Sequence, residues 1–370
     1  MPVESRWMIV CKPLRPPFND GSTVLARDLV RALPSTLPLT YLGDPLRPVR
    51  AAAHDEVVDA PPMAHAPGVL DKIGVLRTLV DPRRRHQPLH FLFTPNQVTS
   101  SVLLAMRRLA PRRPMLQSLM SSHGATRWAA MLRPLDRVVV LSDYTRYRLV
   151  EAGLDGSRVV RIYPAVAAAQ AVPHPSRRRR LLYAGDLDGQ VVSRLAALAR
   201  AMSAGEVADY ALTVASRPKA DGDAGHRRTL RRALAPLIDI GRAELFGEVP
   251  DMGQLMRRCS AQLFLADHVR RKVDLPLVAL EGLMRGLPLL AMEVPPVSEI
   301  FALARRAGLE PGEELVDGRG HQPVVAAIKR WCVDDERLDR AGHAAQALAR
   351  QQFALEKMGD AYCELYKQFA

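Results

Sequence analysis

The chain has 370 residues, of which 52 are Lys or Arg and 39 are Asp or Glu, so its formal net charge is +13. At roughly 100–200 residues per domain, this length predicts two domains or one large one, with a core that needs no disulfide or metal. Hydrophobic residues make up 48% and charged residues 25%, which is a globular composition and excludes a disordered chain. No run approaches about 18 apolar residues, and Met1–Trp7 lacks the pattern of a signal peptide, so we expect a soluble, cytoplasmic protein.

The positive charge is a weak indication of nucleic-acid binding. Only seven of the 52 basic residues are Lys, and a GC-rich genome produces such an arginine excess without any ligand. Aromatic residues, at 5%, are too few to stack on single strands. The runs Arg83–Arg85 and Arg177–Arg180 lie beside prolines in predicted loops, where they are either solvated or contact a negatively charged membrane surface. We therefore expect no specific nucleic acid and, at most, peripheral contact with the inner face of the membrane.

The cysteines and histidines do not form a recognisable metal motif. The four cysteines are far apart and form no C-x-x-C pair, which is typical of reduced, mostly buried thiols. The histidines show no H-x-x-x-H or H-E-x-x-H spacing, so no metal site is predicted. The cysteines are Cys11, Cys259, Cys332 and Cys363.

In the first half of the chain, short aliphatic runs alternate with helical patterns. The runs are nearly continuous in apolar residues, as parallel strands covered on both faces require. The last helix is followed by Gly153, a natural left-handed cap. This alternation predicts a doubly wound parallel sheet. Its strands are predicted at Trp7–Cys11, Leu39–Leu42, Leu89–Phe93, Met115–Leu119, Arg137–Leu141 and Val159–Tyr163, and its helices at Thr23–Leu33, Val98–Leu109 and Thr145–Ala152.

The stretch Pro164–Arg180 has no period and is rich in Ala and Pro, which predicts an interdomain linker at 166–179. Beyond it the alternation restarts, so we predict two Rossmann-like α/β domains, 1–165 and 180–351, whose parallel sheets face a cleft. A helix over about 352–370 is expected to pack back on the first domain. The second set of strands is Leu181–Ala184, Ala211–Ala215, Glu244–Phe246, Gln262–Leu265 and Leu289–Met292, and its helices are about Val192–Met202, His226–Leu237, Met252–Arg258, Leu277–Arg285 and Val297–Arg306.

The loop Lys12–Gly21 follows the first predicted strand. Ligands gather at the carboxyl ends of strands in open parallel sheets, so this loop is a candidate site. Gly21 lets a ligand approach the backbone, and the first helical N–H groups at Ser22 point at an anion. The alternative is a plain turn in which Ser22 or Thr23 caps the helix.

A sharper pattern is V-D-L-P-L-V-A-L-E-G-L-M-R-G-L-P at Val273–Pro288, where a loop runs into a helix. Asp274 lies near the cap, and the free N–H groups that begin at Leu275 and Leu277 form an anion site suited to a diphosphate. Glu281 follows one turn later on an otherwise apolar helix. Its carboxylate can accept two hydrogen bonds from a ribose diol, or it is simply an exposed or capping residue.

Four stretches in fixed order resemble the motifs of one enzyme family, although each is degenerate by itself. They are P-P-F-N-D-G-S at Pro16–Ser22, D-R-V-V-V-L-S-D-Y-T at Asp136–Thr145, L-F-G-E-V-P-D-M-G-Q-L-M at Leu245–Met256, and L-P-L-V-A-L-E-G-L-M-R-G-L-P at Leu275–Pro288 followed by Glu293–Ile300. On these motifs the chain resembles the retaining glycosyltransferases of family four, also called group 1, which have the GT-B architecture.

The resemblance implies a nucleotide-diphosphate sugar as donor, a UDP- or GDP-sugar, bound mainly to the second domain. Glu281 matches the second Glu of the family's Glu-x7-Glu motif, which binds ribose. Val249 lies in the segment whose loop commonly holds the nucleotide base. The first Glu of the motif is replaced by Val273, and Asp274, or the earlier pair Asp267-His268, is the candidate substitute.

Two further departures concern the donor phosphates and the acceptor side. The family's Arg and Lys after the first strand of the second domain are absent here, because Gly185 is followed by Asp186. Arg217 and Lys219 in the next loop are the candidate replacements for binding a diphosphate, the alternative being a solvated loop. At the position of an acceptor-side His the chain has Met120, and the nearest histidine, His123, is either a substrate ligand or a surface residue.

Together these features predict a metal-independent, retaining glycosyltransferase that needs no cofactor besides its donor. Helix N-termini at Ser22 and Leu275, with Arg217 and Lys219, would stabilise the negative charge of the leaving diphosphate. Three alternatives stay open: an enzyme with an unusual small-molecule acceptor, a catalytically degenerate GT-B protein that acts as a partner or regulator, and a basic nucleic-acid binder. The acceptor and the oligomeric state are not predicted.

Overall fold

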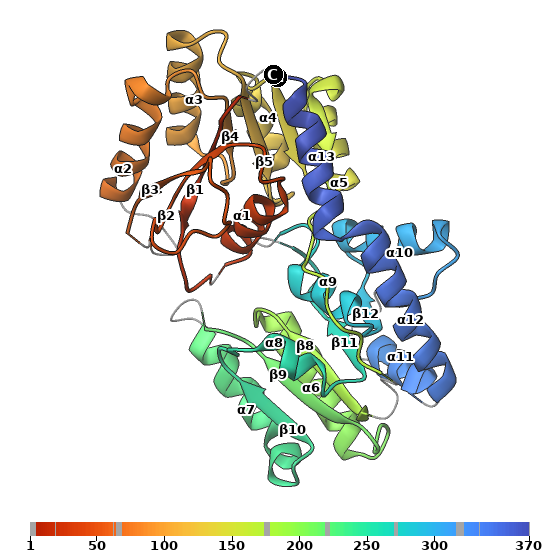
Figure 1. The fold of residues 1–370 in the computed structure, drawn as a ribbon. Coiled ribbons are helices and arrows are strands. Elements are labelled where there is room, and N and C mark those ends of the chain that lie inside the picture. The colour runs from red at the N-terminus through yellow and green to blue at the C-terminus, as the bar shows by residue number, and fades with distance from the viewer. Residues whose placement is uncertain are drawn as a thin grey trace. The chain divides into compact units, whose positions relative to one another are not determined.

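The computed structural model describes residues 5–18, 20–61, 63, 69–173, 178–218, 223–269, 273–315, 322–332 and 334–369. These residues form two compact units, each built on its own parallel sheet (Figure 1). Unit 1 comprises Met1–Ala165, Val269–Leu275 and Ala354–Ala370, and unit 2 comprises Val166–His268 and Pro276–Phe353. In the part of the chain that is described, no helix is long and apolar enough to cross a membrane.

The sheet of unit 1 has seven strands in the order β3-β2-β1-β4-β5-β6-β7, and every neighbouring pair is parallel. Strands β2 and β3 are added in sequence on one side of β1, and β4 then pairs with the other side of β1. The strand order therefore reverses between β1 and β4. The bounds are β1 Trp7–Leu14, β2 Leu39–Gly43, β3 Glu56–Asp59, β4 Leu89–Phe91, β5 Met115–Leu119, β6 Arg137–Val140 and β7 Val159–Arg161.

Helices α2 to α5 cover one face of this sheet, because Leu79, Leu103, Trp128 and Leu149 from the four helices share one apolar core with β1, β4, β5 and β6. Helix α1 packs against α13. The bounds are α1 Gly21–Ala32, α2 Val69–Val80, α3 Gln97–Leu109, α4 Ala125–Leu132, α5 Asp143–Glu151 and α13 Leu355–Lys367, with short 3-10 helices η1 Pro82–Arg84 and η2 Gly156–Arg158.

Helix α13 is fixed to the opposite face of the sheet by a buried polar cluster. The Nδ1 of His90 on β4 lies 2.5 Å from the Tyr366 hydroxyl, and its Nε2 lies 2.7 Å from the Ser118 hydroxyl. The Ser118 hydroxyl is also 2.8 Å from that of Tyr362, and the Tyr366 ring stacks on Trp7 at 4.1 Å. Burial lowers the pKa of His90 to about 3, so the imidazole is neutral in the folded protein.

The sheet of unit 2 has six parallel strands in the order β10-β9-β8-β11-β12-β13. Its order reverses between β8 and β11, as that of unit 1 reverses between β1 and β4. The bounds are β8 Arg180–Ala184, β9 Ala211–Ala215, β10 Ala243–Phe246, β11 Ala261–Phe264, β12 Leu289–Met292 and β13 Gly312–Leu315. Its helices are α6 Gly189–Ser203, α7 Asp223–Asp239, α8 Met252–Met256, α9 Leu277–Met284, α10 Pro295–Arg306, α11 Gln322–Cys332 and α12 Asp335–Gln352.

The position of α9 on this sheet is set by one buried amide. Gln262 on β11 is 5% exposed, and its Nε2 donates to the carbonyls of Ala279 (2.9 Å) and Leu287 (3.3 Å). The same amide fills the space beside Gly282, where a Cβ would lie 2.3 Å from the Gln262 side-chain oxygen. A larger residue at position 282 would require the Gln262 amide to move from its bonds to Ala279 and Leu287.

The predicted doubly wound α/β architecture with two parallel sheets is confirmed, and the six predicted strands of the first half and five of the second all exist. Gly153 has φ +86°, as its predicted capping role requires. Two edge strands, β3 and β13, were not predicted. Their sequences, E-V-V-D and G-E-E-L, carry charges beside only one or two apolar residues and are partly exposed, so they lack the continuous apolar run of a central strand.

The cluster around His90 makes stability depend on pH. The pKa of His90 is about 3 in the folded protein and about 6.5 in the unfolded chain. Between these pH values only the unfolded chain binds the proton, so the free energy of unfolding decreases as the pH is lowered from about 6.5 to about 3. We expect unfolding in urea to cost about 2 kcal/mol less at pH 5 than at pH 7 through this residue. His90→Gln should lower the free energy of unfolding at pH 7 and should abolish the part of its pH dependence that comes from His90. His54→Gln, at an exposed position, should leave both the stability and its pH dependence unchanged. An identical pH dependence in the wild type and His90→Gln would contradict the assignment.

Candidate functional sites at the carboxyl ends of the strands

In unit 1 the N-terminus of α1 lies at the carboxyl end of β1, and its anion-binding groups are already engaged. Asp20 is the N-cap: its carboxylate accepts from the Thr23 amide (2.9 Å), the Ser22 hydroxyl and the Lys12 ammonium (3.0 Å). Burial opposes ionisation of Asp20, but these donors outweigh it and hold the pKa of the carboxyl well below its ordinary value. The start of α1 is therefore a capped turn, the alternative given above for this loop. The cap is Asp20, however, and not Ser22 or Thr23.

Gly21 lies directly against the segment Val269–Leu275, which interrupts unit 2 in sequence and belongs to unit 1. A Cβ on Gly21 would lie 2.9 Å from the Val273 Cγ2. Val273 is 8% exposed, so an aliphatic side chain fills the place beside Gly21. A larger residue at Gly21 requires Val273 to move.

Asp274 fixes this segment to unit 1 through its backbone and its carboxylate. Its amide donates to the Met120 carbonyl (2.9 Å), and its carboxylate accepts from the Ser122 amide (2.5 Å), the Ser142 hydroxyl (2.6 Å) and the Thr145 hydroxyl (2.5 Å). Ser142 is the N-cap of α5, so the carboxylate also lies at the positive end of that helix. Burial raises the pKa of Asp274, and the hydrogen bonds offset this effect only in part.

The expected sugar-contacting role of Asp274 does not fit this environment. Its side chain is 0% exposed and its oxygens already accept three hydrogen bonds. In this position the carboxylate holds parts of unit 1 together, and a contact with a sugar stays a prediction. Sequence reasoning placed it correctly before α9 but had no signal for its partners, which lie more than 120 residues earlier in the chain. Its neighbour Leu275 is also fully buried.

His123 lies in the loop between β5 and α4. It is exposed, and its backbone amide donates to the Ser121 hydroxyl (3.3 Å). The next residue, Gly124, has φ +82° and starts α4 without a side-chain cap. His123 is therefore accessible at the carboxyl end of β5, next to an uncapped helix start, and its role as an acceptor-side ligand stays a prediction.

In unit 2 the reversal of strand order between β8 and β11 marks the place where open α/β sheets bind ligands. Asp267, just after β11, pairs with Arg194 of α6, which is 8% exposed and also donates to the Leu265 carbonyl (2.8 Å). His268 follows, and its buried Nδ1 has no hydrogen-bond partner among the described residues. Arg194 was not predicted because its helical position gives no hint that it reaches this edge.

The loop after β9 carries Arg217, which is half-buried, whereas Lys219 lies outside the described residues. A second cation beside it, Arg227 of α7, was missed from the sequence. Its guanidinium donates to the carbonyls of Ser216 (3.1 Å), Phe246 (2.9 Å) and Leu245 (3.3 Å), which joins the ends of β9 and β10. Burial, and then the neighbouring Arg231, lower the pKa of Arg227. Arg227 thus holds the loop from which Arg217 projects.

The N-terminus of α9 differs from the helix starts of α6 and α8 at the same edge. Asp188 caps α6 and Asp251 caps α8, so their free amides already bind a carboxylate. Helix α9 follows Pro276 with no side-chain cap, which leaves the first-turn amides of Leu277 and Val278 without an acceptor in the described part of the chain. It also follows β11, which flanks the reversal of strand order.

Glu281 lies one turn into α9 and is half-buried, and the Arg285 guanidinium donates to its backbone carbonyl (3.1 Å). Val249 is half-buried in the loop between β10 and α8, and both Val249 and Val278 of α9 pack against the same small core. Among the described residues, no group of three or more His, Cys, Asp or Glu side chains is placed to hold a metal ion.

Solved structures with the same architecture match nearly the whole chain. HepE from Anabaena, in complex with UDP and glucose, superposes with a TM-score of 0.70 at 16% identity and covers 98% of this chain and 99% of its own. Sucrose-phosphate synthase from Thermosynechococcus elongatus gives 0.71 at 16% identity, with 98% of each chain covered. The chain has the GT-B fold.

An α,α-trehalose-phosphate synthase (UDP-forming) from Burkholderia vietnamiensis matches equally well, with a TM-score of 0.69 at 11% identity over 98% of this chain and 100% of that one. At these identities the likeness shows the fold alone. No family model matches the sequence, and a comparison with curated proteins finds no match.

The buried bonds of Asp274 predict a large effect on stability. In Asp274→Ala, the hydroxyls of Ser142 and Thr145, both 0% exposed, lose their acceptor, which costs about 3 kcal/mol and several degrees in the melting temperature. Asp274→Asn keeps one acceptor oxygen and should lose less. The control Asp209→Ala, at an exposed position, should melt like the wild type. A melting curve of Asp274→Ala that matches the control would show that these bonds contribute little.

Proposed function

We propose that this protein transfers a sugar from a nucleotide-diphosphate sugar, as a retaining glycosyltransferase of the family-four kind that works without a metal. The observation that carries the proposal is the uncapped start of α9, beside the reversal of strand order in a GT-B unit, with Glu281 one turn into the helix. Free amides at a helix N-terminus bind a diphosphate, and a carboxylate one turn away binds a ribose diol.

The donor follows from the same residues. The amides of Leu277 and Val278 would hold a phosphate, Arg217 and Lys219 would supply the fixed positive charge, and the loop at Val249 would contact the base. UDP is the first choice of nucleotide, because UDP is bound in HepE and named as a product of the trehalose-phosphate synthase. The helix dipole and the cations would take over the electrostatic task that a metal performs elsewhere.

We assign the acceptor to the carboxyl end of the unit 1 sheet, around Gly21, Ser22 and His123. Retention needs an acceptor that attacks from the face on which the leaving group departs, so the departing diphosphate takes the acceptor proton. No protein carboxylate is then required as base. This is compatible with Val273 in place of the motif glutamate and with a buried Asp274.

A second candidate function is binding without turnover. Val273 removes one carboxylate of the family motif, and Asp274 is sequestered, so the chain has the nucleotide-binding features without the usual sugar-contacting acid. A protein of this kind would bind the nucleotide and serve as a partner or regulator. Hydrolysis or transfer of the sugar in the presence of a broad acceptor mixture separates the two functions.

The donor site is tested by binding. UDP and UDP-glucose should raise the melting temperature, and Glu281→Gln should weaken UDP binding by about 1–3 kcal/mol in calorimetry, because the ribose loses its charged acceptor. The control is Glu336→Gln, whose side chain is 90% exposed on α12. If no nucleotide or nucleotide sugar raises the melting temperature, the donor site does not exist.

Stereochemistry and metal dependence are tested on the product. With an acceptor in hand, NMR of the new glycosidic bond should show the anomeric configuration of the donor, and EDTA should leave the rate unchanged, because fixed cations replace the metal. An inverted product would exclude the retaining mechanism. A loss of rate in EDTA that added Mg²⁺ or Mn²⁺ restores would exclude metal independence.

A further inference from the structure

Residues 82–135 of unit 1 are rich in arginine, although Arg83, Arg84 and Arg107 pair with carboxylates that lie outside this stretch. Residues 82–135 contain nine arginines and neither aspartate nor glutamate. This stretch includes η1, α3 and α4, which together with α2 lie over one face of the sheet. Such a one-sided distribution attracts an anionic surface.

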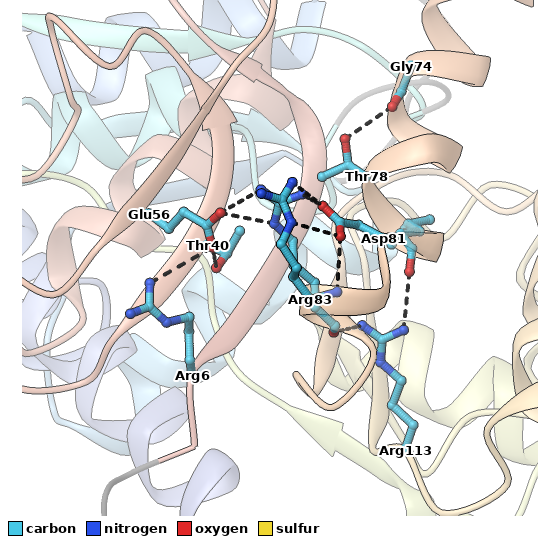
Figure 2. A network of polar contacts seen from close by, with 10 residues as sticks. Arg6, Thr40, Glu56, Gly74, Thr78, Asp81, Arg83 and Arg113 are labelled. Atoms are coloured by element: carbon cyan, nitrogen blue, oxygen red, sulfur yellow. Dashed lines mark hydrogen bonds and ion pairs between the residues drawn. The ribbon is translucent and has the colours of Figure 1, made fainter.

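Some of these arginines are structural. Arg113 is 6% exposed and donates to the carbonyls of Gln87 (2.6 Å), Arg84 (2.8 Å) and Leu79 (3.3 Å), which ties the end of α3 to the ends of α2 and η1. Figure 2 shows this junction together with Asp81, which binds Arg83 and Arg84. These contacts join the segment just after α3 to the last turn of α2 and to η1.

The outer side of the same two helix ends is apolar. Leu76 and Val80 on α2 are 39% and 53% exposed, and Leu104 and Leu109 on α3 are 49% and 80% exposed. In sequence, Arg108 lies between the two leucines of α3 and Arg112 lies three residues after the second. Both arginines are exposed, and neither makes an ion pair within the residues that the structure describes. We call these six residues the α2–α3 surface.

We propose that the α2–α3 surface docks on an anionic lipid bilayer. Exposed Leu and Val side chains gain by entering the acyl boundary, while arginines beside them bind lipid phosphates with a bidentate guanidinium. A nucleic acid fits less well, because leucines find no apolar partner on a phosphate backbone. The aromatic residues of the segment 69–113 are also confined to Phe91, which is buried, and Phe93, which is half-buried, so no exposed ring is available for base stacking.

The surface is separate from the proposed sugar-transfer site. It lies where α2 and α3 end, at the amino ends of β4 and β5, whereas Gly21 and His123 lie at the carboxyl ends of the strands. Docking through this surface leaves the carboxyl ends of the sheet uncovered. The inference therefore does not depend on the proposed function, and either can fail alone.

The test is sedimentation of the full chain with vesicles of phosphatidylcholine containing about one-third phosphatidylglycerol, compared with phosphatidylcholine alone. The wild type should sediment with the anionic vesicles only. Leu104→Ser/Leu109→Ser and Arg108→Gln/Arg112→Gln should each lower the binding constant at least roughly tenfold. Unchanged melting temperatures check that these exposed substitutions leave the fold intact.

The controls match each change elsewhere on the chain. Leu46→Ser alters a 91% exposed leucine of the β2–β3 loop, and Arg228→Gln/Arg232→Gln removes two exposed charges of α7, so both should bind vesicles like the wild type. The proposal is overturned if the wild type does not sediment, or if the α7 variant loses as much binding as the Arg108/Arg112 variant. It is also overturned if the leucine changes have no effect while a DNA duplex binds through Arg108 and Arg112.

Discussion

The buried carboxylate of Asp274 anchors the segment Val269–Leu275 in unit 1. Between β11 and α9 the chain leaves unit 2, and Asp274 joins it to the N-cap of α5 and to the loop after β5. A charge in this position is tolerated only because two hydroxyls, one amide and a helix N-terminus replace its water. Val273 is thereby held against Gly21.

The helix starts at the carboxyl ends of the strands are the reason why we propose the donor site at α9. Most parallel α/β units present several anion-binding helix N-termini, and here the chain's own aspartates occupy those of α1, α6 and α8. Helix α10 begins with two prolines, which lack N–H groups. Helix α9 keeps its donors because Pro276 cannot cap it. Gln262 then holds this helix on β11 through a bond to the Ala279 carbonyl, and its amide fills the space beside Gly282.

Sequence patterns predicted the central strands and the two parallel sheets because β-branched and aliphatic runs dictate buried strands locally. The edge strands β3 and β13 were missed for the opposite reason, since their residues are half-exposed. The capped start of α1, the helical position of Glu281 and the loop position of Arg217 were predicted, because a cap, a helical turn or a loop is a local feature, whereas the roles of Glu281 and Arg217 stay predictions. Arg194, Arg227 and the partners of Asp274 were not, because their contacts span long stretches of sequence and arise only from packing.

The central claim is that a nucleotide diphosphate binds at the start of α9. Hydrogen exchange of backbone amides, measured with and without UDP, tests it residue by residue, because a bound phosphate slows exchange of the amides that donate to it. Slower exchange at Leu277 and Val278 and in the loop around Val249 is the predicted result. Exchange at these amides that is unchanged by saturating UDP, with protection elsewhere or none at all, would contradict it.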